Sequence, residues 1–197
     1  MADLQLSDVR DHVINCFQQD TPGFMHYHNL SHTKTVVIHC QVIGLFYQLP
    51  IEDHFALLTA AWFHDLGQLY SNPADHEIKS AELMNNFMQH SYSPSLIQKI
   101  SDIVLATRQL SQPKTLLQEI IRDSDTYHFG TDEFFSIDTL VKREFEERNK
   151  QKIANWPEHT LNLLLRHQYY TAYCQKKLNA GKDENIIALE KKVRNPD

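Results

Sequence analysis

The sequence predicts an all-α fold, a single-domain helical bundle of eight or nine helices. Apolar residues recur at helical rather than alternating spacing, and only five glycines and seven prolines interrupt the chain. The 197 residues, 42% of them hydrophobic, suffice for one core of substantial size. No internal repeat, low-complexity tract or Gly/Ser linker marks a boundary, so one domain over residues 1–197 is the simplest organisation.

Capping residues and helix breakers divide the chain into helices. Ser7 is a suitable N-cap for the first helix, and Gly67 is a natural left-handed stop for the third. Asp75 and Ser93 are suitable N-caps for the next two, and Gly181 is expected to end a long eighth helix. The expected helices cover about residues 7–19, 31–48, 52–66, 76–90, 94–108, 114–125, 131–148, 157–181 and 184–193, with a loop at 67–75.

Composition and charge exclude several classes of protein. No apolar run approaches the roughly 18 residues of a membrane-spanning helix, and the N-terminus lacks a signal-peptide pattern. Cys16, Cys40 and Cys174 lie far apart without CxxC spacing, which argues against disulfides and against a thiolate zinc site. The formal net charge is -6 and the basic residues are scattered, so neither nucleic acid nor a membrane is an expected partner. We expect a cytoplasmic protein that acts on a small molecule.

Two of the twelve histidines stand on apolar helix faces. His32 begins a stripe that continues with Val36 and Ile43, so its side chain should face the core. The helix that leads to His64 and Asp65 is apolar almost all round, so both polar side chains emerge from a buried helix. An ionised Asp65 there is disfavoured by burial and by the helix macrodipole, and a bound cation would remove both penalties.

A second carboxylate is expected to face the same core. Asp125 continues the apolar stripe of the helix over 114–125, whereas Asp123 is expected on the more polar side. Taken alone, Asp125 is explained by a helix-end turn or a salt bridge to Arg122, and His32 by a hydrogen-bonded core position. Together, two imidazoles and two carboxylates from three helices suit one divalent ion, whether Mn, Fe, Co, Ni, Zn or Mg.

These residues lie in segments with a recognisable pattern. "YHNLSH", "AWFHDLG" and "RDSD" resemble the H…HD…D signature of the HD-superfamily metal-dependent phosphohydrolases. The segments "HEIKSAEL", "IVLATR", "DTYHFGT", "VKREFEE" and "LLLRHQYYTAY" are similar to one subgroup of small predicted HD phosphohydrolases, and the resemblance covers roughly residues 24 to 190. It implies an HD-type bundle with its core at about 24–130 and additional C-terminal helices at about 131–194. The metal ligands that it implies are His32, His64, Asp65 and Asp125.

The resemblance also implies a reaction. A metal-activated water would hydrolyse a phosphoester or phosphoanhydride bond of a nucleotide or a related small phosphorylated metabolite, with His64 and Asp65 as the catalytic pair. His28, Arg108 and Arg122 are the substrate-binding candidates. Each also has an ordinary explanation, because His28 suits a turn and the two arginines suit helix C-termini.

Two other functions are compatible with the sequence. The first is a non-catalytic HD module that keeps its metal and binds a ligand or regulates a partner. The second is an oxygenase with a di-iron centre on the same fold, which needs a second metal site. His76 and His90 lie in the appropriate part of the chain, but His76 is expected to be solvated at a helix start and His90 to lie at a helix end.

Overall fold

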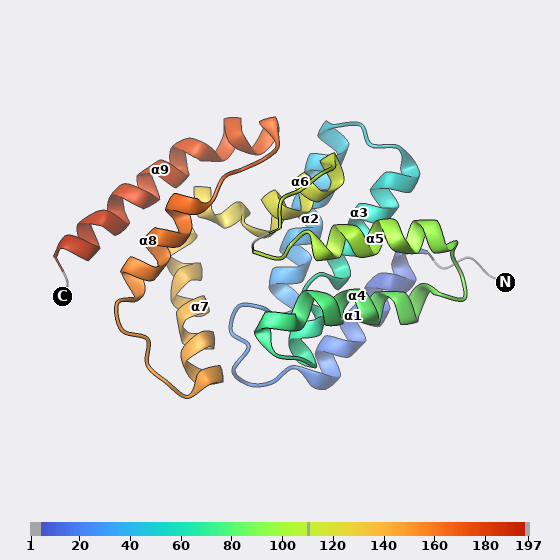
Figure 1. The fold of residues 1–197 in the computed structure, drawn as a ribbon, viewed down its shortest axis with the longest axis horizontal. Coiled ribbons are helices and arrows are strands. Elements are labelled where there is room, and N and C mark those ends of the chain that lie inside the picture. The colour runs from blue at the N-terminus through green and yellow to red at the C-terminus, as the bar shows by residue number, and fades with distance from the viewer. Residues whose placement is uncertain (1–4, 110, 196–197) are drawn as a thin grey trace. The chain divides into compact units, whose positions relative to one another are not determined.

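The computed structural model describes residues 5–109 and 111–195, and every regular element within these ranges is helical, which confirms the all-α fold class (Figure 1). The α-helices of this part are α1 (Leu6–Asp20), α2 (Leu30–Phe46), α3 (Ile51–Phe63), α4 (His76–Met88), α5 (Pro94–Leu105), α6 (Leu116–Asp125), α7 (Phe134–Asn149), α8 (Trp156–Arg166) and α9 (Ala172–Arg194). Three short 3-10 helices lie between them, η1 (Leu66–Leu69), η2 (Pro73–Asp75) and η3 (Tyr127–Gly130).

The chain forms two compact units. The N-terminal unit comprises Met1–Pro22 and His28–Asp125, and the C-terminal unit comprises Gly23–Tyr27 and Thr126–Asp197. Among the described helices, none combines the length and the hydropathy that a membrane crossing requires.

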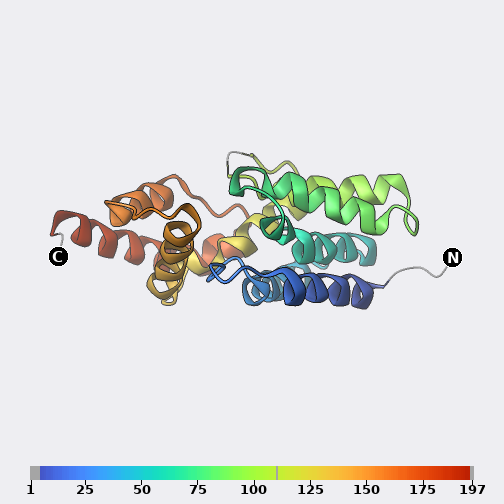
Figure 2. The ribbon, with the colours of Figure 1, turned by 90° about the horizontal axis from the view of Figure 1, so that it is seen from below.

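Helix α3 is the centre of the N-terminal unit. It lies between α1 and α2 on one side and α4 and α5 on the other (Figure 2), and it also contacts α6. Every residue from Ala56 to Phe63 is buried. Removing this apolar surface from water is the main favourable contribution to the stability of the unit. The all-round apolar pattern of the sequence therefore marks the most enclosed helix.

The helix starts follow local hydrogen bonds. Ser93 caps α5 as predicted, because its hydroxyl accepts from the backbone N–H of Leu96. The prediction for Ser7 is wrong, since α1 begins at Leu6 and Gln5 occupies the N-cap position. The carboxylate of Asp8 accepts from the backbone N–H of Gln5 at 2.7 Å and so satisfies the exposed donor one turn earlier.

Gly67 has a different role from the predicted left-handed stop. No glycine in the described ranges has a positive φ, and Gly67 lies inside η1, so the expected loop at 67–75 contains short 3-10 turns. A Cβ at Gly67 would collide with the backbone carbonyl of His76 and would lie 2.8 Å from the backbone nitrogen of Ser80. The glycine is needed because the start of α4 packs directly on this turn.

The predicted long helix over 157–181 is also wrong. Helix α8 ends at Arg166, and α9 begins after Thr171, whose hydroxyl accepts from the backbone N–H of Cys174. Gly181 lies within α9, and a Cβ there would collide with the carbonyl oxygen of Gly130. It therefore permits close packing of α9 on η3 instead of ending a helix.

Candidate metal centre

The four predicted ligands lie at helix ends of the N-terminal unit. His32 is in the first turn of α2, where the side chain of Asn29 caps the helix by accepting from the N–H groups of Ser31 and His32. His64 and Asp65 follow α3 directly, and Asp125 is the last residue of α6. Polar side chains can be buried at these positions because the apolar bodies of the helices enclose them.

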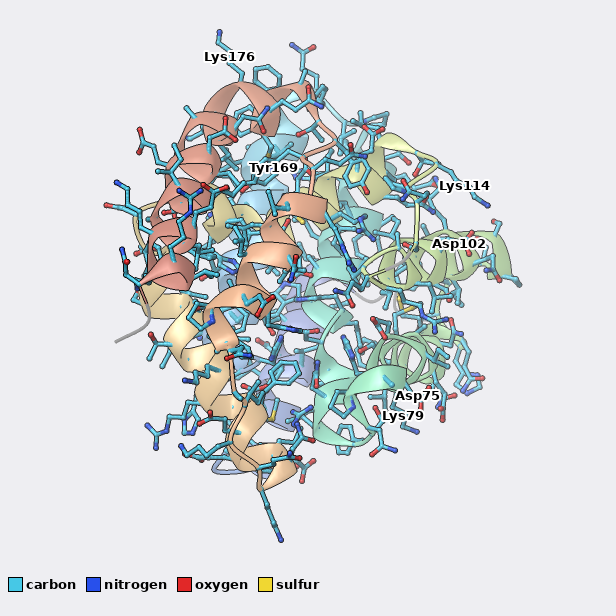
Figure 3. All side chains as sticks on the ribbon, turned by 60° about the vertical axis from the view of Figure 1, so that its left-hand side comes forward. Asp75, Lys79, Asp102, Lys114, Tyr169 and Lys176 are labelled. Atoms are coloured by element: carbon cyan, nitrogen blue, oxygen red, sulfur yellow. The ribbon has the colours of Figure 1, made fainter. Side chains whose placement is uncertain are left out.

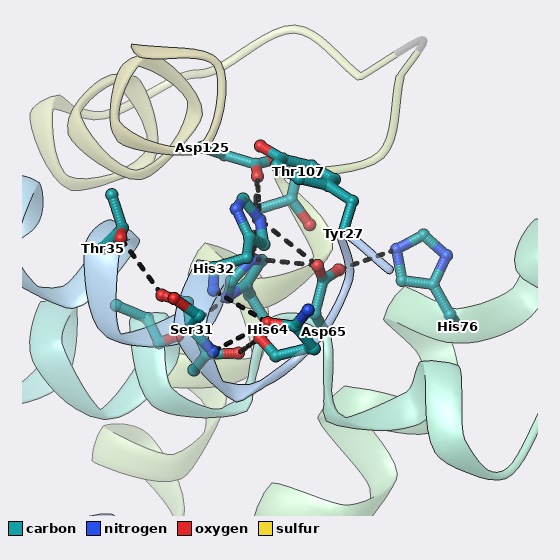
Figure 4. Close-up of polar contacts among 12 residues, drawn as sticks. Tyr27, Ser31, His32, Thr35, His64, Asp65, His76, Thr107 and Asp125 are labelled. Atoms are coloured by element: carbon teal, nitrogen blue, oxygen red, sulfur yellow. Dashed lines mark hydrogen bonds and ion pairs between the residues drawn. The ribbon is translucent and has the colours of Figure 1, made fainter. Parts of the chain in front are cut away.

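The structure brings the four side chains together (Figure 4). Nε2 of His32 lies 3.0 Å from Oδ1 of Asp125 and 3.4 Å from Nε2 of His64. Oδ2 of Asp65 lies 3.4 Å from each of these two imidazole nitrogens, and Nε2 of His64 lies 3.6 Å from Oδ1 of Asp125. One atom each from His32, His64 and Asp125 falls within 4.8 Å of the others, so these three can hold a metal ion.

The ring of His64 is fixed in a ligating orientation. Its Nδ1 lies 2.8 Å from the backbone carbonyl oxygen of Ala61. A carbonyl can only accept, so Nδ1 carries a proton and Nε2 faces His32, Asp65 and Asp125. A backbone partner on one ring nitrogen is the usual device that orients a metal-binding histidine.

Asp65 is the least satisfied of the four groups. Its side chain is 5% exposed, and its Oδ2 is buried without a hydrogen-bond partner in the described part of the chain. The nearby imidazole nitrogens, at 3.4 Å, lie beyond good hydrogen-bonding distance. A buried carboxylate oxygen in this state is costly unless a cation compensates it.

Charge coupling within the cluster is strong. Burial opposes the charged form of His64, but the neighbouring carboxylates Asp65 and Asp125 outweigh it and raise the pKa of this imidazole well above its usual value. The pKa of His32 is raised by the same two carboxylates against the effect of burial. Burial works against the charge of Asp65 and Asp125 too, yet the imidazoles hold both carboxyl pKa values below their usual range. The two carboxylates therefore favour a positive charge in the space between them.

His76 joins this cluster, contrary to the expectation that it is solvated. Its Nε2 lies 3.3 Å from Oδ1 of Asp65, and its Nδ1 donates to the carbonyl of Pro73 at 2.6 Å. Burial lowers the pKa of His76, but the contact with Asp65 outweighs burial and raises it to about 9. Figure 4 shows the imidazole approaching Asp65 on the side opposite His64.

Gly67 allows His76 to reach the cluster. A side chain at Gly67 would collide with the backbone of His76, and the N–H of Gly67 donates to the hydroxyl of Ser80 at 2.8 Å. The turn after Asp65 is thereby bound to the first turns of α4. His90, in contrast, lies exposed beyond the end of α4, as expected.

The substrate-binding candidates lie in different environments. The ring of His28 packs edge-on against that of His32, with 5.9 Å between the centroids. Nη1 of Arg122 donates to the carbonyls of Ala106 and Arg108, each at 2.7 Å, and so closes the C-terminal end of α5. Arg108 is exposed three residues beyond that helix. The structure thus brings His28, and not Arg122 Nη1, toward the candidate ligands.

The prediction that Asp123 lies on the more polar side of its helix is wrong. Asp123 is fully buried, whereas the side chain of Asp125 is 28% exposed. The buried stripe of α6 is centred on Leu117 and Ser124, and the two aspartates flank it on opposite sides. Of these two aspartates, only Asp125 lies on the side of α6 that faces His32. The prediction of Asp125 as a ligand therefore does not depend on which carboxylate is more buried.

Comparison with protein-family models, with curated proteins and with solved structures gave no significant match.

Proposed function

We propose that this protein is a metal-dependent phosphohydrolase of the HD type, with one divalent ion bound by His32, His64, Asp65 and Asp125. The observation that carries the proposal is the buried Oδ2 of Asp65, which has no hydrogen-bond partner among the described residues and lies 3.4 Å from two imidazole nitrogens. Donors from three separate helix ends converge there, which favours a ligand site over an ordinary polar contact in a core.

A cation fits the electrostatics of the cluster. Without a metal, protons on His32 and His64 compensate the carboxylates of Asp65 and Asp125, as their raised pKa values indicate. A divalent ion would supply this positive charge and release the imidazoles as neutral nitrogen ligands. Nitrogen and carboxylate oxygen donors in this combination suit Mn, Fe, Co, Ni or Zn, and Mg is compatible with the carboxylates.

The chemistry follows from the placement of the residues. When bound, the ion supplies Lewis-acid chemistry, since it acidifies water and offsets negative charge on a phosphoryl oxygen. The Nδ1–carbonyl hydrogen bond keeps His64 in one orientation, and Asp65 lies between His64 and His76. The half-buried His28 lies beside His32, where it can donate to a phosphate oxygen. A nucleotide or a related small phosphorylated metabolite is the proposed substrate.

The test combines metal content with activity. Purified protein is assayed for bound metal and for hydrolysis of a panel of nucleotides and phosphoesters in the presence of Mn2+, Co2+ or Ni2+. His64→Ala and Asp65→Ala are compared with His90→Ala and Asp11→Ala, which change an exposed histidine and an exposed aspartate. We expect metal and activity to be lost together in the first pair only.

The same assay separates the alternatives. Metal bound to the wild type with no turnover of any substrate would favour a non-catalytic ligand-binding module. Two iron ions per chain with oxygen consumption would favour an oxygenase. Absence of bound metal in every protein would contradict all three functions.

A further inference from the structure

The chain passes between the two units at three junctions, and two of them adjoin the candidate metal centre. Tyr27 ends the first segment of the C-terminal unit, and His28 follows it directly, four residues before His32. Asp125 ends the N-terminal unit, and Thr126 opens the second segment of the C-terminal unit. Two ligand-bearing helix ends are therefore covalently joined to backbone that belongs to the C-terminal unit.

The C-terminal unit binds the first of these segments through a buried carboxylate. Glu144 of α7 is 2% exposed and accepts from the backbone N–H of Tyr27 at 2.8 Å. One turn further on, Glu147 lies 2.8 Å from Nε2 of His26. Arg148 lies 3.6 Å from Glu144 and covers the ring of Phe24 at 5.1 Å from its centroid. The segment that precedes α2 is thus bound along its length.

The second segment is bound by the break between α8 and α9. Tyr169, which is 2% exposed, donates its hydroxyl to the carbonyls of Thr126 at 3.3 Å and of Tyr127 at 3.2 Å. Nε2 of His167 lies 2.9 Å from the hydroxyl of Thr126. Figure 3 marks Tyr169 in this region, while the neighbouring Lys176 extends from the ribbon into solvent. The residue next to Asp125 is therefore held by the buried Tyr169 and the half-buried His167.

These contacts fix backbone groups rather than fill a core. A buried carboxylate or hydroxyl is costly unless it is hydrogen-bonded, and both groups satisfy main-chain atoms next to ligand-bearing segments. Metal affinity depends on ligands that are held in place before the ion arrives, and hydrogen-bonded groups behind the ligands supply this order. These contacts hold the backbone of Tyr27, five residues before His32 in the chain, and of Thr126, which follows Asp125 directly.

We propose that Glu144 and Tyr169 are positioning residues for the metal centre, Glu144 through Tyr27 toward His32 and Tyr169 through Thr126 toward Asp125. Each would influence metal affinity through the chain next to a ligand, without providing a ligand itself. This inference rests on the proposed metal site.

Tyr169→Phe tests the second contact, because it removes only the hydroxyl. The apparent dissociation constant for Co2+ is measured by absorption titration. We expect it to rise about tenfold, which is the loss of affinity typical when a residue that orients a metal ligand is removed. The absorption spectrum of the Co2+-saturated variant should also differ from that of the wild type, since the ligand geometry is less constrained. Lys176→Ala is the control, because Lys176 lies exposed on α9, and it should change neither quantity.

Glu144→Ala tests the first contact in the same titration. We expect a loss of about tenfold in Co2+ affinity, with recovery in Glu144→Gln, whose amide oxygen still accepts from the N–H of Tyr27. Glu146→Gln is the control, since Glu146 contacts Lys152 and the N–H of Ile153 and should bind Co2+ as the wild type does.

A double-mutant cycle separates positioning from general stability. If Tyr169 acts through Asp125, Tyr169→Phe should not weaken Co2+ binding further in an Asp125→Asn background. Wild-type affinity and spectrum in both Tyr169→Phe and Glu144→Ala would overturn this inference while leaving the metal site intact. A wild-type protein that binds no Co2+ would overturn the metal site as well.

Discussion

Asp138 and Asn185 of the C-terminal unit differ from Asp65 of the N-terminal unit in how their polar atoms are satisfied. In the C-terminal unit, the carboxylate of Asp138 accepts from Trp156 and Thr160 at 2.9 Å each, and the amide of Asn185 donates to the carbonyls of Phe129 and Thr131 at 3.0 Å each. In the N-terminal unit, by contrast, an oxygen of Asp65 is buried without such a partner. Hydrogen-bonded polar groups such as those of Asp138 stabilise a fold, whereas a buried carboxylate oxygen without a hydrogen bond beside two imidazoles is suited to a bound cation.

Removing a proposed ligand should have the largest effect, and the affected quantity should be the metal affinity. We expect His64→Ala and Asp65→Ala to weaken metal affinity by at least about 100-fold, because each removes a direct donor and disturbs the group hydrogen-bonded behind it. Isothermal titration with Mn2+ or Co2+ measures the change, and far-ultraviolet circular dichroism controls for folding. Affinity equal to that of the wild type would remove the contrast between the two units.

Removing a paired group in the C-terminal unit should instead affect stability. Asp138→Ala leaves the indole N–H of Trp156 and the hydroxyl of Thr160 without their acceptor, so we expect a loss of about 1–3 kcal/mol in the free energy of unfolding. Asp138→Asn keeps an acceptor oxygen and should lose less. Chemical denaturation measures both variants, and a change in metal affinity larger than their change in stability would contradict the prediction.

Metal binding should release protons, with a definite dependence on pH. The pKa values of His32 and His64 are raised in the metal-free chain, so these imidazoles keep a proton to higher pH than a free histidine and must lose it from Nε2 to bind an ion. Affinity should therefore fall as pH decreases. Titration calorimetry in two buffers of different ionisation enthalpy counts the protons, and the absence of any release would show that the imidazoles are not ligands.

The smallest predicted effect concerns His76 in metal-free protein. Its pKa is raised to about 9 by Asp65, so its stabilising charge is fully present below its unfolded pKa of about 6.5 and is lost as pH rises through 9. The stability difference between wild type and His76→Ala in the presence of chelator should shrink over that interval. Urea denaturation at pH 6, 8 and 10 checks this, and a difference that grows with pH would contradict the assigned pairing.

The sequence was a good guide wherever local periodicity determines the structure. The apolar stripe that starts at His32 is buried at Val36 and Ile43, as expected, and the apolar helix before His64 is the central one. The residues that could be predicted as ligands were those that interrupt such stripes. The fold class and the burial of these helix faces follow from such patterns, whereas the number of helices agrees only because the break near residue 170 offsets the merging of the last two predicted helices.

What the sequence did not reveal depends on contacts between distant segments. The break between α8 and α9 contains neither proline nor glycine, and it is stabilised by the hydroxyl of Tyr169 on carbonyls more than forty residues earlier. His76 reaches Asp65 only because Gly67 lets α4 pack on the intervening turn. Neither contact has a periodic signature, so helix patterns alone could not predict it.

The central claim is tested most directly by the metal stoichiometry of the intact chain. Native mass spectrometry of protein purified without chelator, then loaded with Co2+ and desalted, should show one tightly bound ion per chain in the wild type and in His90→Ala, and none in Asp65→Ala. An ion retained by Asp65→Ala, or no ion in the wild type, would contradict the assignment of the His32, His64, Asp65 and Asp125 cluster as a metal centre.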